Sequence, residues 1–304
     1  MRAAAILGPG SSERDLKLFQ CEPRISWTLG LPAAGDADVV LIFGGDGTVH
    51  RHLGALVKLG LPILVIPQGS GNDFARALRI VGVRDAFKAW RQFGSGPDRA
   101  KAVDLGVITP LESEVPQKTA VVTAAAEHHP QRYFCCVAGV GLDAAVVERT
   151  NRLPGWLRSH GGYALSLPAA LLGFEAAHIT ISEQKCDQRS DVRPQYSDRA
   201  LLAAFANTPV FGGGMRIAPR ALMDDGQLDI CVVGDISKLK LLSVFPTVYA
   251  GRHLGIRQVE YFQAECVRVE TEVPLDVYAD GEYVCQTPVE IKIAAGALRV
   301  VTPG

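Results

Sequence analysis

The sequence predicts a protein of two parts, an α/β half with a parallel sheet followed by a half made mainly of antiparallel β-strands. In the first hundred residues, short apolar runs alternate with segments of helical periodicity, which is the pattern of a parallel α/β sheet. Beyond about Asp104, short β-branched runs alternate with turns, as in antiparallel β structure. The length of 304 residues also favours two domains, because a single domain has roughly 150 residues.

Three continuous apolar runs predict the central strands of the first half. They cover residues 3–7, 39–43 and 63–66, and glycine or proline closes each of them. Strands of a parallel sheet are covered on both faces, so they lack polar alternation. We expect residues 24–28 to add another strand and residues 13–19 to form a short helix.

Two helices are expected after the second and third of these runs. The first has Thr48 as its N-cap and Gly60 as its stop, and its apolar residues lie on one helical face. These residues are Val49, Leu53, Leu56 and Val57. The second helix begins with Asn72 or Asp73 as its N-cap. Such strand–helix alternation places a ligand at the C-terminal ends of the strands.

The second half is expected to contain short strands and few helices. The β-branched runs are residues 120–123, 178–182, 228–233, 266–270 and 289–293. Residues 111–118 and the polar segment 183–198 are expected to be exposed hairpin connections.

Composition excludes several classes of protein. With 48% hydrophobic and 21% charged residues, the chain is not intrinsically disordered. Lys and Arg number 31 against 32 Asp and Glu, so no basic field exists to hold nucleic acid. The longest apolar stretch, residues 163–174, is shorter than the 18 or so residues of a membrane span. The N-terminal run is also too short for a signal-peptide core, so we expect a cytoplasmic protein.

Cysteine and histidine show no metal-binding pattern in the sequence. The seven cysteines include no C-x-x-C pair, and we expect reduced thiols that fill the core. His50 and His52 are spaced i, i+2 on the first helix, so they point to different faces and are not a ligand pair. His253 is expected to be a packed or capping residue.

Two glycine-rich turns are the strongest candidates for chemistry. Residues 44–48 (GGDGT) follow a strand and open a helix, where unpaired backbone N–H groups and the helix dipole attract phosphate. Residues 67–73 (PQGSGND) repeat this design on the neighbouring strand, so both turns face one crevice. Asp46 would repel a phosphate unless a divalent cation lay between them. Taken alone, it could equally be a turn or helix-capping residue.

These turns and several later segments resemble one known family. GGDGTVH (44–50) and PQGSGNDFARAL (67–78) resemble the catalytic domain of diacylglycerol, sphingosine and ceramide kinases and of bacterial lipid kinases. The resemblance continues, in the same order, through VDLG (103–106), FCCVAGVGLDAAVV (134–147), NTPVFGGGMRIAPRALMDDGQLDI (207–230) and ADGEYVCQTPVEIKIAAGALRVVTP (279–303). It covers the chain from about residue 38 to its end.

The resemblance implies a Rossmann-like α/β nucleotide domain of the NAD kinase/diacylglycerol kinase type and a C-terminal antiparallel β-sandwich. The first domain would be residues 1–104, with residues 294–304 as candidates to complete it, and the second would be residues 105–293. In the cleft between them, ATP would phosphorylate a lipid hydroxyl with Mg²⁺ as cofactor. Diacylglycerol is the leading substrate, and a sphingoid or related lipid alcohol comes next.

By the same resemblance, the turn at residues 8–11 stands in place of the family's usual first phosphate loop. The nucleotide-binding positions so implied are Gly8, Pro9, Gly10, Ser11, Thr28, Gly44, Gly45, Asp46, Gly47, Thr48, Ser70, Asn72 and Asp73.

The resemblance also implies three acidic residues with roles in catalysis. Asp46 would act on the catalytic Mg²⁺ and the transferring phosphoryl group, and Glu282 would accept the proton of the lipid hydroxyl, supported by Asp280. Phosphoryl transfer needs positioning, charge neutralisation and a base near the attacking oxygen, so this arrangement is chemically reasonable. Without the other motifs, the DGE segment would be read as a hairpin turn with a solvated glutamate.

A second metal site is implied in LMDDGQ (222–227). Asp225 and the main-chain oxygens of Leu222 and Gln227 would hold a structural Mg²⁺, which prefers such hard oxygen ligands. The alternative is a hairpin turn without an ion. Asp104 matches a family residue that links this region to the active site, or it caps a strand end.

Two features depart from the family. Arg51 occupies a position where relatives usually carry Glu, so it either points to solvent or makes a different contact near the nucleotide. The N-terminal segment is short, and residues 8–10 lack the expected Asn-Pro start. Two alternatives therefore stay open: a kinase of a small soluble substrate such as NAD, and a catalytically weak nucleotide- or lipid-binding regulator.

The partners so expected are ATP and a lipid, with peripheral and transient membrane contact. Because the net charge is −1, that contact must depend on local apolar or basic patches. Residues 163–174 would either cover an acyl chain or belong to the core. A homodimer is one candidate for the oligomeric state.

Overall fold

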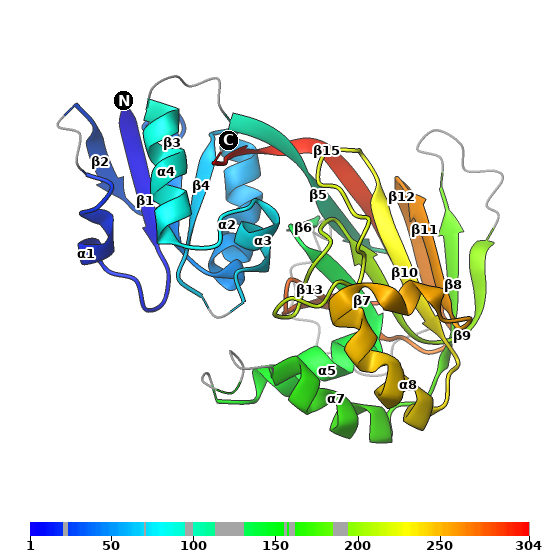
Figure 1. Cartoon of the computed structure of the whole chain (residues 1–304). Helices are drawn as coiled ribbons and strands as arrows, with labels where there is room; N and C mark the ends of the chain where they lie inside the picture. Colours follow the sequence, from blue (N-terminus) through cyan, green and yellow to red (C-terminus); the bar gives the residue numbers. More distant parts are fainter. Residues whose placement is uncertain are drawn as a thin grey trace, which may run out of the picture.

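In the computed structural model, an N-terminal α/β part and a larger C-terminal β part lie side by side (Figure 1). β5 (Ala100–Pro110) pairs with β15 (Val289–Val301), and both strands run from one part into the other. The structure describes residues 1–20, 24–69, 71–94, 100–112, 131–154, 157, 162–184 and 194–303.

The N-terminal sheet is parallel, as the apolar runs predict. Its strand order is β2-β1-β3-β4-β15, and β15 joins through the pairing of Val300 with Ile63. Every residue of β3 and β4 is buried, which is why these segments carry no polar alternation. The first four strands are β1 (Arg2–Leu7), β2 (Ser26–Leu29), β3 (Val39–Gly44) and β4 (Ile63–Pro67).

The helix after β3 begins three residues earlier than predicted. α2 (Asp46–Leu59) has Gly45 as its N-cap, so Thr48 lies inside the first turn and the prediction of Thr48 as the cap was wrong. Thr48 is buried, and its hydroxyl fills the space where Gly8 and Gly44 lack side chains. The predicted stop is confirmed, because Gly60 is in the left-handed conformation at φ 62°.

The other helices of this part are α1 (Glu13–Leu16), α3 (Asp73–Ala77) and α4 (Val83–Gly94). Asn72 is the N-cap of α3, as one of the two predicted choices had it. α4 was not predicted, although its buried residues Ala86, Ala89, Trp90 and Phe93 follow a helical period.

The C-terminal part is mainly antiparallel β structure, and the predicted strands at 178–182, 228–233, 266–270 and 289–293 are all present. Its strand order is β14-β13-β7-β9-β8-β12-β15. Outside this order, β10 pairs with β9 and β11, and β5 pairs with β15 and β6. The remaining bounds are β6 (Arg132–Phe134), β7 (Val137–Gly141), β8 (Ala177–Glu183), β9 (Pro194–Ala206), β10 (Leu228–Gly234), β11 (Val259–Ala264), β12 (Cys266–Thr271), β13 (Asp276–Ala279) and β14 (Glu282–Gln286).

One predicted connection is shorter in the structure, and the other lies mostly outside the described residues. The polar segment 183–198 was predicted too long, because β9 begins at Pro194 and pairs with β8. The predicted strand 120–123, and residues 113–118 of the other connection, lie outside the described residues.

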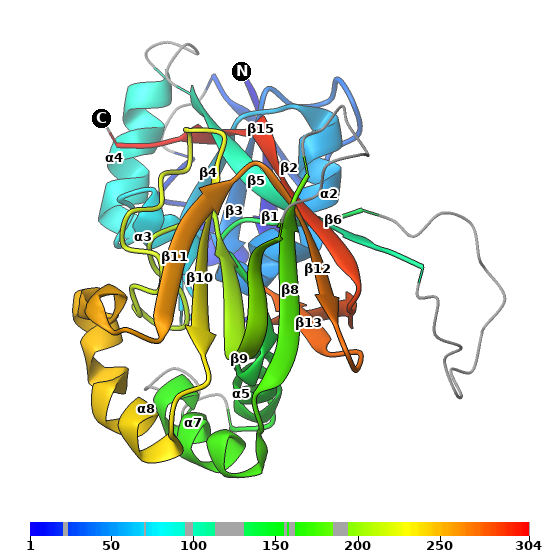
Figure 2. The same cartoon turned by 90° about the vertical axis from the view of Figure 1, so that its right-hand side faces the viewer.

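Helices cover one side and end of this β structure, which the sequence did not predict. They are α5 (Leu142–Asn151), α7 (Gly162–Gly173), α8 (Lys238–Val244), η2 (Phe245–Ala250) and η3 (Arg252–Gly255). Figure 2 shows α5, α7 and α8 gathered at one end of the strands. None of the helices in the described ranges combines the length and apolar character required to cross a bilayer.

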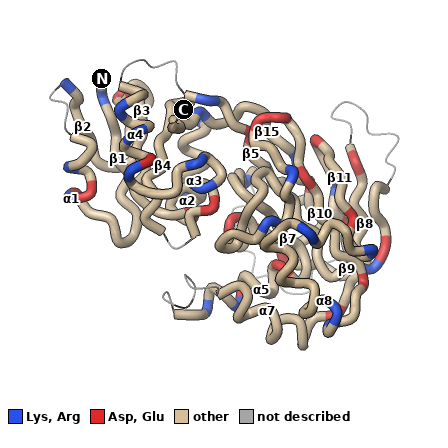
Figure 3. Tube along the Cα trace, viewed as in Figure 1, with Lys and Arg blue, Asp and Glu red and all other residues tan. Residues whose placement is uncertain are grey.

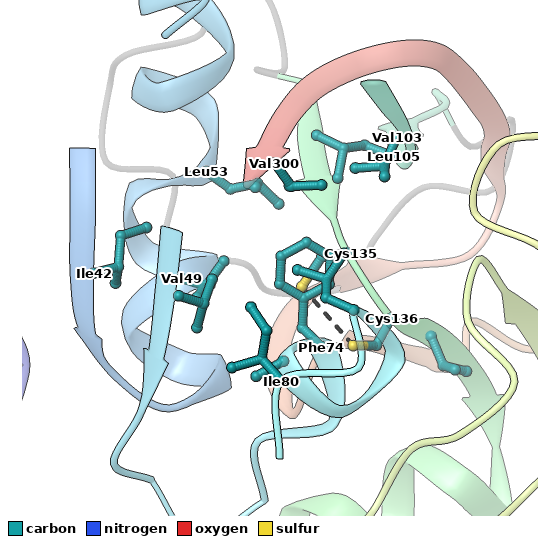
Figure 4. Close-up of a cluster of buried hydrophobic side chains, with 14 of the residues drawn as sticks. Ile42, Val49, Leu53, Phe74, Ile80, Val103, Leu105, Cys135, Cys136 and Val300 are labelled. Carbon is teal, nitrogen blue, oxygen red and sulfur yellow. Dashed lines mark hydrogen bonds between the residues drawn. The ribbon is translucent and has the colours of Figure 1, made fainter. Parts of the chain in front are cut away.

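An apolar cluster joins the two parts. Phe74 of α3 lies among Val103 and Leu105 of β5 and the adjacent Cys135 and Cys136, and all five are buried (Figure 4). Basic and acidic residues are mixed along both parts (Figure 3), in agreement with the near-zero net charge. The apolar contact therefore fixes the glycine-rich turns relative to the C-terminal strands.

Candidate active site

The structure brings the two glycine-rich turns into direct contact. A side chain at Gly45 would begin 2.8 Å from the Cα of Gly69, which is too close for any residue with a Cβ. Asn72 closes the second turn, since its side chain accepts a hydrogen bond from Gly69 N at 2.9 Å and donates one to Gly69 O at 2.6 Å. The glycines are therefore required by close backbone approach.

The turn after β1 lies beside the turn after β3. Gly8 N donates to Phe43 O at 2.7 Å, and Ser11 Oγ donates to the same oxygen at 2.9 Å. Ser11 Oγ also contacts the side-chain oxygen of Gln68. Three strand-end turns thus form one edge, with Pro9 and Gly10 exposed on it.

Two implied nucleotide residues are not placed at this edge. Thr28 is exposed on β2, where it pairs with Ala4, and β1 separates it from β3. Ser70 lies outside the described residues. Arg51 is exposed to solvent, which is one of the two expected outcomes for this residue.

Asp46 caps the neighbouring helix. Its Oδ2 accepts a hydrogen bond from Asp73 N at 2.9 Å, and its Oδ1 accepts one from Phe74 N at 3.1 Å, both at the start of α3. The pKa of Asp46 is raised to about 6 by burial and by the charges of Asp73 and Asp280, against the effect of the two N–H donors. Each carboxylate oxygen keeps a lone pair that a cation can use.

Asp73 connects the two parts of the molecule. Its carboxylate is buried, and Oδ2 accepts a hydrogen bond from Gly213 N at 2.9 Å. Arg76 forms an ion pair with the other oxygen, Oδ1, and donates to Gly71 O at 2.8 Å. The second glycine-rich turn is therefore fixed to residues 212–214 of the C-terminal part, which we call the GGG loop.

Asp280 is the most heavily bonded carboxylate of the site. Its Oδ2 accepts a hydrogen bond from Cys135 N at 2.7 Å and lies 3.1 Å from His50 Nδ1. Its Oδ1 accepts a hydrogen bond from Cys136 N at 2.8 Å. Burial would raise the pKa of Asp280, but the bond and charge of His50 and the two backbone donors outweigh it, so this pKa is lowered. The same contact raises the pKa of His50 against the opposing effect of burial.

Glu282 lies over the N-terminus of α2. A Cβ on Gly47 would be 3.7 Å from Glu282 Oε1, and the glutamate is exposed. The turn that carries it is also held by Asn151 of α5, which donates to Gly281 O at 2.8 Å. The DGE turn is thus anchored from α2, from α5 and from the β6–β7 bend.

Sequence reasoning did not identify three of these anchors: His50, Asn151 and the amides of Cys135 and Cys136. His50 follows Asp46 by four residues, so the two share a helical face, and that spacing is the signal that could have found it. The other contacts join residues more than 100 positions apart and leave no local pattern.

The LMDDGQ turn is joined to the domain junction by Asp104. This residue is 3% exposed, and its carboxylate accepts hydrogen bonds from Gly226 N at 2.8 Å and Gly296 N at 2.7 Å. Asp225 is exposed and accepts Gln227 N at 3.1 Å, while Leu222 is also exposed. The structural Mg²⁺ on Leu222, Asp225 and Gln227 stays a prediction.

An apolar cavity lies between the helices and the strands of the C-terminal part. Tyr163 and Leu167 of α7 line it, together with Phe211 and Met215 at the two ends of the GGG loop. Asp143 is a buried carboxylate of its lining and accepts a hydrogen bond from the Tyr163 hydroxyl at 2.7 Å. Burial raises the pKa of Asp143 to about 6.

His253 also borders this cavity. It is buried, and its Nε2 lies 3.0 Å from Ile217 O. The expectation of a packed residue is therefore confirmed. The five described cysteines are reduced thiols, and the four that are buried confirm the expected core-filling role, while Cys21 and Cys186 lie outside the described residues.

Comparison with known proteins identifies the two parts. Residues 19–108 match the diacylglycerol kinase catalytic domain, and residues 136–302 match the YegS C-terminal NAD kinase beta sandwich-like domain. A diacylglycerol kinase of Mycobacterium tuberculosis is 30% identical over 287 residues, covering 90% of this chain and 80% of that protein. A diacylglycerol kinase of Bacillus subtilis is 25% identical, covering 89% and 80%.

Solved structures share the fold. A diacylglycerol kinase of Bacillus anthracis superposes with a TM-score of 0.65 at 20% identity and covers 99% of this chain and 96% of its own. An NAD kinase of Archaeoglobus fulgidus superposes with a TM-score of 0.51 at 14% identity, covering 100% and 94%. The fold is thus a parallel α/β domain of the NAD kinase/diacylglycerol kinase type with a β-sandwich-like domain. The match along almost the whole chain shows that the protein belongs to the diacylglycerol kinase catalytic-domain family, in the YegS-type group of ATP-using lipid kinases.

Proposed function

We propose that this protein transfers the γ-phosphoryl group of ATP to the hydroxyl of diacylglycerol, forming phosphatidic acid. The position of Glu282 supports this most directly, because it puts a solvent-accessible carboxylate over the N-terminus of α2. The choice of diacylglycerol follows the relatives in Mycobacterium tuberculosis and Bacillus subtilis.

The nucleotide would bind at the edge formed by the three strand-end turns. Backbone N–H groups at Gly45 and Gly47 and the dipole of α2 favour phosphate there. Mg²⁺ would be held at Asp46, where it supplies neutralisation of the phosphate charge. The lone pairs left on Asp46 fit that role, and the hydrogen bonds to α3 fix the carboxylate in place.

Glu282 would act as the base. It accepts the proton of the lipid hydroxyl as that oxygen attacks phosphorus, and its exposure lets the substrate reach it. Asp280 and His50 act as positioning residues, because they are bonded to each other and Asp280 also accepts backbone N–H groups rather than facing solvent. The Asp225 turn would hold a structural Mg²⁺ that stabilises the domain junction.

The apolar cavity would hold the acyl chains. Phe211 and Met215 line it, while Gly213 of the same loop donates a hydrogen bond to Asp73 beside the glycine-rich turns. One loop therefore contacts both the lipid side and the nucleotide side. This arrangement would let a lipid lie with its chains among the helices and its hydroxyl near Glu282.

Membrane contact would occur at a patch on α7, α8 and η2, which we call the helix patch. Its exposed apolar residues are Leu165, Leu172, Leu239, Leu242 and Tyr249. Lys238 and Lys240 lie on α8 among them, and cations of this kind favour anionic lipid surfaces. Because the same helices line the cavity, a lipid leaving the bilayer here would have a short path into it.

The test is transfer of ³²P from [γ-³²P]ATP to diacylglycerol, sphingosine, ceramide and NAD presented separately to the purified protein. Diacylglycerol should be the best acceptor. Glu282→Gln should lower kcat by about 10²-fold or more, the usual contribution of a general base, with little change in the KM for ATP. Glu272→Gln, an exposed glutamate in a turn after β12, is the matched control and should retain activity. Transfer mainly to NAD, or full activity of Glu282→Gln, would contradict the proposal.

A further inference from the structure

The adjacent thiols of Cys135 and Cys136 form an unusual cluster with Asp280. The chain bends between β6 and β7 at these two residues, so both sulfurs face the same side instead of alternating as in a strand. The Sγ atoms are 3.9 Å apart, and Cys135 Sγ lies 3.3 Å from Asp280 Oδ2. Figure 4 shows the two sulfurs facing each other beside Phe74.

These distances match the coordination of a tetrahedral soft cation. With Zn–S bonds of about 2.3 Å and a Zn–O bond of about 2.1 Å, tetrahedral angles separate two sulfurs by roughly 3.8 Å and a sulfur from an oxygen by roughly 3.6 Å. Within the described ranges, this is the one group of three or more His, Cys, Asp or Glu side chains whose ligand atoms all lie within 4.8 Å. His50 Nδ1, 3.1 Å from Asp280 Oδ2, is the nearest candidate for a fourth ligand.

We propose that Cys135, Cys136 and Asp280 form a latent site for one thiophilic divalent cation of the zinc and cadmium type, and that its occupation inhibits the enzyme. The binding step releases the two thiol protons to solvent as both sulfurs become thiolate ligands, and it involves no change of oxidation state. Binding does not depend on the proposed function, whereas the inhibition rests on it.

The chemistry of the site selects against the cations that kinases use. Burial, the neighbouring thiol and the charge of Asp280 raise the pKa of Cys135. The hydrogen bond between the two thiols lowers the pKa of Cys136, but burial and the charge of Asp280 outweigh this effect and raise the pKa to about 12. Two sulfur ligands beside one carboxylate select an ion with strong affinity for thiolate, so Mg²⁺, which prefers oxygen ligands, is excluded.

Inhibition follows from the position of Asp280. Its carboxylate holds the DGE turn through Cys135 N, Cys136 N and His50. A cation on Oδ2 competes with His50 for that oxygen, and it pulls on the turn that carries Glu282. Since the thiols are buried, the turn must open to admit the ion, and we expect binding to be slow.

Cadmium binding to the reduced full-length protein tests the site directly. Titration with Cd²⁺ should produce the ultraviolet thiolate-to-cadmium band and saturate this site at one ion per chain. Cys135→Ser/Cys136→Ser should abolish that band. Asp280→Asn should weaken the affinity for Cd²⁺ by at least the roughly 10–100-fold typical of losing a supporting residue.

Cys285→Ser is the matched control, because this half-buried thiol is outside the cluster. Circular dichroism and thermal unfolding of each variant establish that it is folded. An unchanged band in the folded double-serine variant would overturn the site.

Kinase assays after incubation with Zn²⁺, at fixed Mg²⁺ and ATP, test the inhibition. The wild-type rate should fall at least tenfold. The zinc concentration at the midpoint of this inhibition should match the zinc affinity obtained by competition against the cadmium band. Cys135→Ser/Cys136→Ser should keep most of its own zinc-free rate. Equal inhibition of both proteins would overturn the inhibitory role. Absence of lipid phosphorylation in any protein would instead contradict the proposed function, while the cadmium titration would still decide the site.

Discussion

Asp280 and Glu282 are separated by one glycine, yet the fold gives their carboxylates opposite environments. Asp280 is buried and accepts three backbone N–H groups in addition to its contact with His50. Glu282 is exposed above Gly47. A carboxylate with all its lone pairs in use cannot easily take a substrate proton, whereas a hydrated one can. The proposed division between a positioning residue and a base therefore follows from hydrogen bonding.

At the same scale, Asp143 should make stability depend on pH. Its pKa is raised from 3.8 to about 6 because burial disfavours the charged form, and the groups that face it are the Tyr163 hydroxyl and the backbone of Gly139. The folded state therefore holds a proton that the unfolded chain releases, so this stabilisation is complete below pH 3.8 and is lost as pH rises through about 6. Between these two pH limits, the contribution of Asp143 to the free energy of unfolding falls by about 3 kcal/mol.

Urea unfolding of the wild type and Asp143→Asn between pH 4 and pH 7 measures this contribution. The wild type should lose about 3 kcal/mol relative to the variant over that range. Asp36→Asn, at an exposed position, should leave the pH dependence of the wild type unchanged. Parallel curves for the wild type and Asp143→Asn would show that Asp143 titrates normally.

At the scale of elements, α7 and α8 each carry apolar residues on two faces, one toward the cavity and one toward solvent. Leu167 and Leu241 line the cavity, while Leu172 and Leu239 are 77% and 83% exposed on the opposite side. Lys238 Nζ donates to Leu172 O at 2.9 Å and joins the two helices. Helices that are apolar on both faces suit a contact with lipid on the outside and within the protein.

Leu172→Glu/Leu239→Glu should therefore weaken binding to vesicles that contain anionic phospholipid and diacylglycerol. Each buried leucine contributes about 1.5–3 kcal/mol, so affinity measured by sedimentation should fall at least about tenfold. Activity on a water-soluble short-chain diacylglycerol should persist, because the cavity face is unchanged. The control Val81→Glu, 76% exposed in the N-terminal part, should bind vesicles normally. Equal vesicle binding by all three proteins would exclude the helix patch as the membrane contact.

The sequence predicted the elements whose signal is local. β3 and β4 are continuous apolar runs ended by Gly44 and Pro67, and such runs reflect burial on both faces. The C-terminal helices were missed because α5 has little amphipathic pattern and α7 is apolar all round, so neither shows the one-sided period of a surface helix. The site was predicted as separate motifs. Their assembly through Asp73 with Gly213, or His50 with Asp280, depends on contacts across 140 and 230 residues.

At the scale of the whole molecule, Asp104 joins three segments at the junction of the two parts. Its carboxylate accepts hydrogen bonds from Gly226 N and Gly296 N, and its backbone N–H donates one to Met223 O at 2.7 Å. Asn207 Nδ2 donates to Asp104 O at 2.8 Å. Gly296 lies where the β5–β15 pairing shifts register, at φ 60°, so the carboxylate stabilises the bend that carries β15 from one part into the other.

Asp104→Ala should consequently destabilise the protein as a whole. It leaves two N–H groups, whose hydrogen bonds are partly buried, without their acceptor. Each unsatisfied donor costs about 1–3 kcal/mol, so we expect a loss of about 2–6 kcal/mol in urea unfolding. Asp224→Ala is the matched control, because this nearby carboxylate forms only an exposed ion pair with Lys101 and should cost less than about 1 kcal/mol. Because the apolar cluster of Phe74, Leu105 and Cys136 joins the two parts, intrinsic fluorescence and circular dichroism should report one common transition in both variants. Equal losses in the two variants would mean that the junction does not depend on the Asp104 carboxylate.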